Sequence, residues 1–215
     1  MKEKMIKGVI FDLDGVIVHT DKYHYLAWKA LADEIGIYFD EVINNRLRGV
    51  SRMDSLDIVL ERSDKAYSDE EKRALAEKKN GLYVELLSNM SEKDVSEDVM
   101  NTLLSLKSRG YKIAIGSSSK NAKRILERVG LLDMFDAIAD GNDIQRSKPA
   151  PDVFLVAAKK LLLSSDESVI VEDAVAGVQA GRAANMLTFG LGDASENKAA
   201  DHNLNILSDI LEYLK

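Results

Sequence analysis

The run Val9-Ile10-Phe11-Asp12-Leu13-Asp14-Gly15 sets three bulky apolar residues directly before two acidic residues and a glycine. The apolar part belongs to a candidate strand over residues 6–11, which is short and rich in β-branched residues, as strands buried on both faces are. An Asp-Gly pair after a strand usually marks only a turn. The run therefore predicts a buried strand that ends in two carboxylates, and the meaning of those carboxylates depends on the rest of the chain.

Four further segments have the same short apolar character, and they alternate with helical patterns. They lie at residues 112–116, 135–139, 168–171 and 186–189. Helical stripes with a 3.6-residue period run from Ala122 to Val129, before Gly130, and from Phe154 to Leu162, just after Pro151. Alternation of this kind is typical of a parallel sheet with crossover helices, so we expect an α/β fold with a Rossmann-like parallel sheet core.

The interval between the first two strands is far longer than one crossover needs. Apolar residues recur there at helical spacing (Tyr23, Leu26, Ala27, Ala30 and Leu31), and residues 69–87 form a long charged amphipathic block. We therefore expect an inserted helical subdomain over residues 19–91. The core would then be discontinuous, built from residues 1–18 and 92–215.

Composition narrows the class of protein. The 215 residues are 46% hydrophobic and 30% charged, as in a globular protein with a real core, and there is no cysteine for a disulfide, a thiol nucleophile or a cysteine zinc site. The formal charge of −7 argues against a general nucleic-acid or anionic-membrane surface. No apolar run approaches the roughly 18 residues of a membrane span, and residues 1–5 lead into a strand rather than a signal peptide. We expect a cytoplasmic protein that binds neither nucleic acid nor membrane.

Residues that could take part in catalysis or metal binding gather where the predicted strands end, which is where open α/β sheets bind ligands. They are Asp12 and Asp14, the run Ser117-Ser118-Ser119, Lys148, and the pair Glu172-Asp173. Taken singly, each is more often a turn, a helix cap, a solvated helix start or a surface lysine. Together they indicate a metal-assisted phosphoryl site, because clustered carboxylates repel one another unless a cation neutralises them. Oxygen ligands without histidine or cysteine favour Mg²⁺.

Four segments, in order along the chain, resemble the motifs of the haloacid-dehalogenase phosphotransferase superfamily. They are residues 9–15, Gly116-Ser117-Ser118, Lys148-Pro149 and Val171-Glu172-Asp173. The helical insertion is similar to the cap of the sugar phosphomutases in that superfamily, through residues 23–31, 48–55, 79–80 and 117–121. The resemblance implies an enzyme that interconverts β-D-glucose 1-phosphate and D-glucose 6-phosphate through an aspartyl phosphate and a β-glucose 1,6-bisphosphate.

The resemblance also assigns roles in the core. Asp12 would be the nucleophile and Asp14 the general acid–base, while Ser117 and Lys148 would hold the phosphoryl oxygens. Mg²⁺ would be held by the Asp12 side chain, the Asp14 backbone carbonyl and Asp173, with Glu172 close by.

The cap and the serine loop would bind the substrate. His24 and Lys79 would couple cap closure to Asp14, although core packing is the ordinary alternative for both His24 and Trp28, which lie one helical turn apart beside the apolar stripe. The remaining predicted substrate contacts form a sugar-recognition loop with an anion clamp, and a serine loop that opens a helix and would hold a second phosphate. They are Arg48, Gly49, Val50, Ser51, Arg52 and Ser55, and Ser118, Ser119, Lys120 and Asn121.

Four positions depart from the pattern expected of those mutases. Arg48 stands where lysine is common, Ser118 where alanine is, Met53 where an acid is, and Ala174 where serine is. None of them replaces a residue of the predicted phosphoryl chemistry, so the departures concern the choice of sugar.

Two other functions fit part of the pattern. A sugar-phosphate phosphatase of the same fold shares every core residue and differs in the cap. A non-enzymatic phospho-receiver module also joins strand-end acids, Mg²⁺, a hydroxyl and a lysine, but it has no such insertion and its acceptor lies in mid-sequence, where this chain has Asp140. We expect the mutase, acting as a monomer on a small sugar phosphate.

Overall fold

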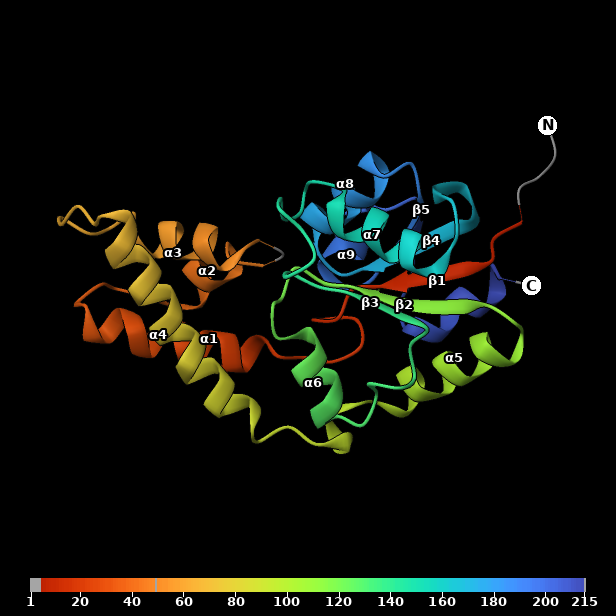
Figure 1. Cartoon of the computed structure of the whole chain (residues 1–215), viewed down its shortest axis with the longest axis horizontal. Helices are drawn as coiled ribbons and strands as arrows, with labels where there is room; N and C mark the ends of the chain where they lie inside the picture. Colours follow the sequence, from red (N-terminus) through yellow and green to blue (C-terminus); the bar gives the residue numbers. More distant parts are fainter. Residues whose placement is uncertain (1–4, 49, 215) are drawn as a thin grey trace.

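The computed structural model describes residues 5–48 and 50–214, and its centre is a six-stranded parallel sheet (Figure 1). The strand order is β3-β2-β1-β4-β5-β6, and the pairing register sets Phe11 opposite both Ile115 and Val171. The strands are β1 (Gly8–Phe11), β2 (Lys112–Gly116), β3 (Ala137–Ala139), β4 (Ser168–Glu172), β5 (Leu187–Gly190) and β6 (His202–Asn203). The five predicted strands are confirmed with shifts of one or two residues at their ends, and the two-residue β6 was not anticipated.

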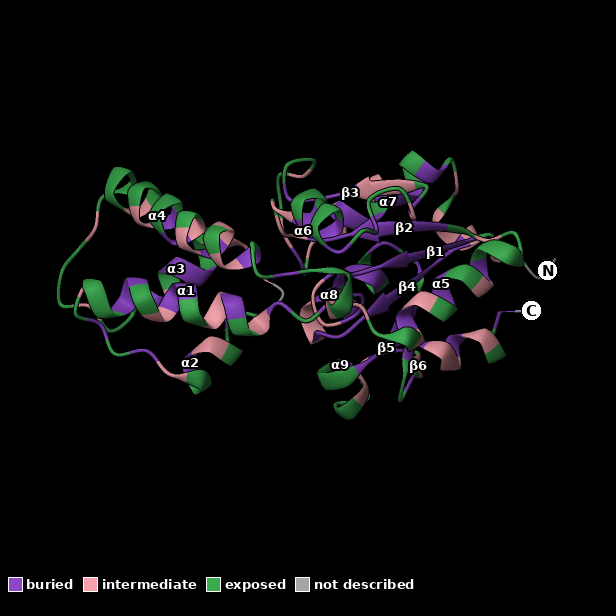
Figure 2. Ribbon diagram, turned by 90° about the horizontal axis from the view of Figure 1, so that it is seen from below, coloured by how far each residue is buried: buried purple, intermediate pink, exposed green. Residues whose placement is uncertain are grey.

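Helices cover both faces of the sheet, because alternate residues of each buried strand point to opposite sides. Val9 and Phe11 join one buried apolar cluster, and Ile10 joins a second with Phe154 and Ala157. Figure 2 draws β1 and β4 as buried along their length. The elements of this part are α5 (Glu97–Ser108), α6 (Ala122–Arg128), α7 (Asp152–Leu161), α8 (Val175–Ala183), α9 (Gly192–Glu196), η1 (Glu92–Asp94), η2 (Ser165–Glu167) and η3 (Leu207–Glu212). The predicted α/β class with a Rossmann-like sheet is confirmed.

Residues 21–87 of the long interval between β1 and β2 fold into helices that lie beside one end of the sheet (Figure 1). This helical unit comprises α1 (Asp21–Glu34), α2 (Glu41–Asn45), α3 (Arg52–Leu60) and α4 (Asp69–Leu87). It has its own buried cluster around Trp28, Leu56 and Ala76. The limits 19–91 proposed for a separate subdomain stay a prediction, because Tyr83 and Leu87 at the end of α4 pack into the apolar cluster of the sheet.

Two helices of this unit show what the sequence pattern determines. Helix α4 has the predicted bounds, and a capping box starts it, in which Ser68 and Glu71 satisfy each other's backbone N–H groups. In α1, Trp28 belongs to the buried face, whereas Leu26 is 49% exposed and Ala30 faces solvent. The expectation that Trp28 lies beside the apolar stripe is therefore wrong. The buried face of α1 includes Trp28 instead of Leu26 and Ala30, so it is rotated about the helix axis relative to the stripe we inferred.

The ends of two core helices differ in kind. Helix α6 is followed by Gly130 in the left-handed region (φ 71°), as the sequence predicts. Helix α7 begins after Pro151, as expected, but ends at Leu162, which has a left-handed backbone (φ 58°) without being glycine. Its side chain is 85% exposed, so nothing apolar compensates the steric cost of that conformation.

We expect Leu162→Gly to raise the free energy of unfolding by about 1 kcal/mol, since it removes the clash of Cβ in the left-handed region and loses almost no buried area. Urea unfolding followed by circular dichroism measures the change. Gly130→Ala, at the equivalent position after α6, serves as the reverse control and should destabilise by a similar amount. A loss of stability in Leu162→Gly would contradict this reading of the α7 terminus.

Candidate active site

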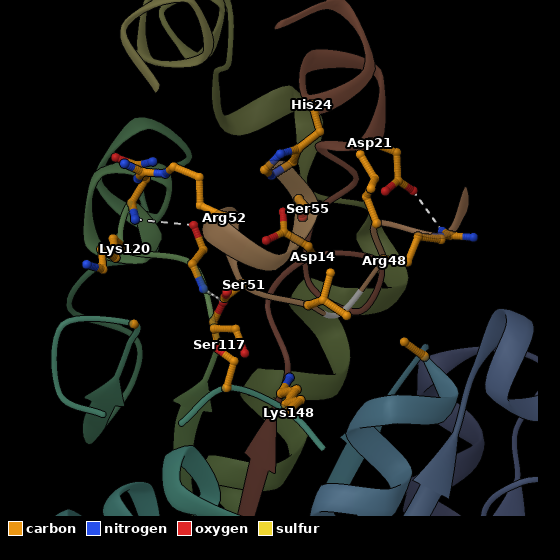
Figure 3. A pocket seen from close by; sticks show the side chains of 18 of the residues that line it. Asp14, Asp21, His24, Arg48, Ser51, Arg52, Ser55, Ser117, Lys120 and Lys148 are labelled. Atoms are coloured by element: carbon orange, nitrogen blue, oxygen red, sulfur yellow. Dashed lines mark hydrogen bonds and ion pairs between the residues drawn. The ribbon is translucent and has the colours of Figure 1, made fainter. Parts of the chain in front are cut away.

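One pocket lies between the carboxyl ends of the strands and the helical unit. It is lined by every predicted site residue that the structure describes; Gly49 lies outside the described residues. Figure 3 shows Ser117 and Lys148 reaching it from the sheet side, with Asp14, His24 and Arg52 around them. Residues that are far apart in the sequence therefore meet in one place.

The acidic floor of the pocket comes from the ends of β1 and β4. Asp12, Glu172 and Asp173 are buried, and each offers a carboxylate oxygen within 4.8 Å of the others. Burial, and then the charges of Glu172 and Asp12, raise the pKa of Asp173 to about 8. Two glycines leave room for these groups, since a Cβ on Gly15 or Gly177 would fall 2.1 Å from an Asp173 oxygen or 1.8 Å from a Glu172 oxygen. This hard, crowded oxygen set fits a metal cation.

Lys148 neutralises part of this floor. Its ammonium group donates to Asp12 Oδ1 at 2.5 Å and also to Glu172 Oε1, and the side chain is almost fully buried. Burial alone would lower the pKa of Lys148. The carboxylates of Asp12 and Glu172 outweigh burial and raise this pKa above its usual value. The lysine is therefore a fixed positive charge beside Asp12.

Asp14 lies close to this floor but has a different partner. The Thr20 hydroxyl, at the start of α1, donates to Asp14 Oδ1. Burial and the neighbouring Asp12 charge raise the pKa of Asp14 to about 7. Asp14 can therefore exist in both protonation states near neutral pH, as a general acid–base must.

The opposite wall is built by α1 and α4. Lys79 Nζ lies 2.9 Å from His24 Nδ1, and the Tyr83 ring stacks on the His24 ring with centroids 4.1 Å apart. The Lys79 ammonium also sits 4.7 Å and 4.6 Å from the ring centroids of Trp28 and Tyr83. Aromatic faces, rather than a carboxylate, thus surround this buried cation. Burial and the Arg52 charge lower the pKa of Lys79 to about 7, and burial holds the pKa of His24 well below its usual range.

Two arginines of the helical unit reach toward the pocket. Arg48 Nη2 bonds Asp21 at 2.8 Å (Figure 3) and lies 3.6 Å from Asp173, so it connects the helical unit to the acidic floor. Arg52 Nη1 donates to Glu77 Oε1 at 3.2 Å. The pocket therefore has an acidic floor and a basic wall.

The serine loop after β2 is held by its own hydroxyls. Ser117 Oγ accepts from the Ser119 N–H at 3.1 Å, and Ser119 Oγ accepts from the Asn121 N–H at 3.2 Å. The Ser118 Oγ is buried without a hydrogen-bond partner. The helix that follows, α6, has seven residues, and Asn121 is the residue before its first turn.

Sequence reasoning missed several residues of the pocket. Asp21, Asn44, Asn80, Tyr83 and Ser147 line it and received no site role. Tyr83 could have been found from its spacing, because it follows Lys79 by one turn within the predicted helical block over residues 69–87. Asn44 and Ser147 carry no such local signal.

Comparisons with known proteins establish the family. The model of the haloacid dehalogenase-like hydrolases matches residues 6–185. The chain belongs to this family. Over 207 residues it is 40% identical to the β-phosphoglucomutase of Bacillus subtilis, a match that covers 95% of this chain and 92% of that relative.

A solved structure and a second relative extend the comparison. The crystal structure of a β-phosphoglucomutase from Clostridium difficile superposes with a TM-score of 0.91 at 41% identity, over 97% of this chain and 95% of that one. The fructose-1-phosphate phosphatase of Escherichia coli is 31% identical over 83% of this chain and 93% of its own length. In the part of the chain that the structure describes, no helix is both long enough and apolar enough to span a membrane.

The burial of Lys79 predicts how the free energy of unfolding should depend on pH. Its folded-state pKa lies below that of an unfolded lysine, so the unfolded chain binds more protons between about pH 7 and pH 10 and the protein gains stability from this group as pH rises through that window. Lys79→Met should therefore stabilise the free protein by about 2 kcal/mol at pH 6 and by much less at pH 10. Urea unfolding at both pH values measures this.

Lys78→Met is the matched control, because Lys78 is the neighbouring lysine of α4 and forms an exposed ion pair with Glu34. It should change stability little at either pH. An equal effect of Lys79→Met at pH 6 and pH 10 would show that the Lys79 ammonium carries no burial penalty.

Proposed function

We propose that this protein is a β-phosphoglucomutase, which interconverts β-D-glucose 1-phosphate and D-glucose 6-phosphate through an aspartyl phosphate and β-glucose 1,6-bisphosphate. The observation that carries the proposal is that one pocket combines two groups of residues. They are the floor of Asp12, Lys148 and Glu172 and the wall of His24 and Lys79 from the helical unit. The similarity to β-phosphoglucomutases over nearly the whole chain supports it.

The floor carries out phosphoryl transfer. An Asp12 oxygen attacks phosphorus and the bond from phosphorus to the sugar oxygen breaks, which leaves an acyl phosphate on Asp12. Asp14 gives a proton to the departing sugar oxygen and takes one from the attacking hydroxyl in the return half-reaction. Ser117 and Lys148 hold the remaining phosphoryl oxygens and balance their charge.

The metal site belongs to the same floor. We propose Mg²⁺, held by the carboxylates of Asp12 and Asp173 and the backbone carbonyl of Asp14, with Glu172 close by. Such an ion would supply positive charge to the phosphoryl oxygens during transfer. The three buried carboxylates within 4.8 Å support this assignment.

A mutase also needs a place for the second phosphate of its bisphosphate intermediate. Arg52, Ser119, Lys120 and Asn121 line the same pocket and offer donors and positive charge away from Asp12. The bisphosphate would turn over between half-reactions, so that each phosphate is placed in turn at Asp12.

The helical unit supplies specificity and excludes water. The segment Arg48–Ser55 would recognise the sugar, with Val50, Ser51 and Ser55 lining the pocket beside the two arginines. His24 and Lys79 would link its closed position to Asp14. Closure over the sugar would protect the acyl phosphate from hydrolysis, which is the difference between a mutase and a phosphatase.

The place of action follows from the substrate. Hexose phosphates are charged metabolites of the cell interior, so we propose a cytoplasmic enzyme, acting as a monomer on a small sugar phosphate. Analytical ultracentrifugation of the loaded enzyme would test the monomer.

Product analysis separates the mutase from the phosphatase alternative, which the 31% identity to a sugar-phosphate phosphatase keeps in view. Phosphorus NMR with α- and β-glucose 1-phosphate, Mg²⁺ and a bisphosphate primer should show conversion of the β-anomer to glucose 6-phosphate with little free phosphate. Dominant phosphate release from both anomers would establish the phosphatase instead.

The site of phosphorylation gives a second test. Asp12→Asn should abolish the phosphoenzyme formed with acetyl phosphate and Mg²⁺, whereas Asp140→Asn should form it normally. The Asp140 carboxylate accepts the Asn142 N–H at 2.8 Å, which places it in a local turn that an asparagine also supports. Mass spectrometry of trapped protein measures both. Phosphate found on residue 140 would favour the receiver-module alternative and overturn the proposed mechanism.

Metal binding should be visible in stability at pH 8. Mg²⁺ at 100 times its dissociation constant should raise the free energy of unfolding by about 2.7 kcal/mol, because it binds only the folded cluster. Asp173→Ala should remove most of this gain, whereas Asp193→Ala, an acid at the start of α9 outside the cluster, should keep it. Equal responses of the two variants to Mg²⁺ in thermal unfolding would refute the assigned site.

A further inference from the structure

Helix α4 presents two polar residues to the pocket's anion-binding groups. Glu77 and Asn80 are three residues apart, so they share a face of the helix. Glu77 Oε1 accepts from Arg52 Nη1 at 3.2 Å, and Asn80 Oδ1 accepts from Asn121 Nδ2 at 3.0 Å. Arg52 and Asn121 come from different elements, the start of α3 and the residue before α6. One helix face therefore holds two of the groups assigned above to the second phosphate.

The contact between Asn80 and Asn121 crosses from the helical unit to the sheet side of the pocket. Both residues line the pocket and both are half-buried. Because Asn121 lies at the tip of the serine loop, its carboxamide could otherwise rotate and present either its oxygen or its nitrogen to a ligand.

Asn80 selects one of these two orientations. Its carbonyl oxygen accepts one hydrogen of the Asn121 NH₂ group, which leaves the second hydrogen for another acceptor. With the Asn80 amide oriented as it is, a flipped Asn121 would set its oxygen against the Asn80 oxygen and the two would repel. A phosphate has only acceptor oxygens toward such a group, so the selected orientation is the one that binds it.

We propose that Asn80 is a positioning residue for the second phosphate, acting through Asn121, whose NH₂ group it keeps directed to the pocket. The proposal rests on the proposed function, since the bisphosphate is the ligand that fills this end of the pocket. Asn80 hydrogen-bonds Asn121 rather than Asp12, Ser117 or Lys148, the residues assigned to the phosphoryl group being transferred. Its effect should therefore appear in the binding of two-phosphate ligands and spare transfer from a one-phosphate donor.

Calorimetry with β-glucose 1,6-bisphosphate and Mg²⁺ measures the binding in an Asp12→Asn background, where turnover is blocked. Adding Asn80→Ala should raise the bisphosphate dissociation constant about fivefold, the scale of the free-energy cost of ordering one side chain on binding. Asn89→Ala is the matched control, because Asn89 follows the end of α4 and bonds only the Leu86 carbonyl there. It should leave the dissociation constant unchanged.

Two further measurements exclude a merely structural role. With Asp12 intact, the rate of phosphoenzyme formation from acetyl phosphate should be the same in Asn80→Ala and the unmodified protein. In an Asn121→Ala background, Asn80→Ala should produce no additional loss of affinity, because the two residues act in series.

Several results would overturn the proposal. They are an unchanged dissociation constant in Asn80→Ala, a full additive loss in the Asn121→Ala background, or an equal loss of reactivity with acetyl phosphate. The binding measurement does not depend on turnover. A roughly fivefold loss of bisphosphate affinity in a protein that only hydrolyses sugar phosphates would therefore refute the mutase function and uphold the role of Asn80. Mutase activity with unchanged affinity would do the reverse.

Discussion

The site depends on one buried charge arrangement, in which Lys148 lies between Asp12 and Glu172. Carboxylates removed from water destabilise a fold unless a cation and hydrogen bonds compensate them. The sheet order makes this arrangement possible, because β1 lies between β2 and β4 and its last residue pairs with both. Asp12 and Glu172 therefore emerge side by side, and Lys148 brings an ammonium group to both. Gly15 and Gly177 keep the space open, since any side chain there would collide with the carboxylates.

The chain carries a formal charge of −7 and yet builds a basic wall for an anionic ligand. Lys79 contributes to that wall without a carboxylate partner, stabilised by the faces of Trp28 and Tyr83 and by a histidine nitrogen. A carboxylate beside Lys79 would cancel the charge that an incoming phosphate ester needs. The aromatic surroundings leave that charge available, at the cost of a lowered pKa. Acidic floor and basic wall thus suit the two kinds of partner that the pocket must hold together, a cation and a sugar phosphate.

Much of this could be predicted from the sequence, for identifiable physical reasons. Strands buried on both faces are continuous apolar runs, and ligand-binding residues follow their carboxyl ends, so β1, Asp12 and Glu172 could be placed by pattern alone. The two-residue β6 is too short to leave a pattern. The error over Trp28 has a different cause, because stripes displaced by one position look similar in sequence and only the packing of α4 against α1 selects between them. Asn80 is an ordinary polar helix residue until the fold brings it to Asn121, a contact 41 positions away in the chain.

Helix α4 connects these features, because its two halves belong to different parts of the molecule. Ala76 packs in the cluster of the helical unit, whereas Tyr83 and Leu87 pack in the cluster of the sheet. Between them lie Lys79 and Asn80, which contact His24 in the basic wall and Asn121 in the serine loop respectively. The helix therefore packs against both parts of the molecule, and Lys79 and Asn80 in its middle line the pocket between them. A regular helix of 19 residues is rigid over this distance, which explains how groups from the helical unit can be aligned with Asp12 although the two parts of the chain are joined only by short connections.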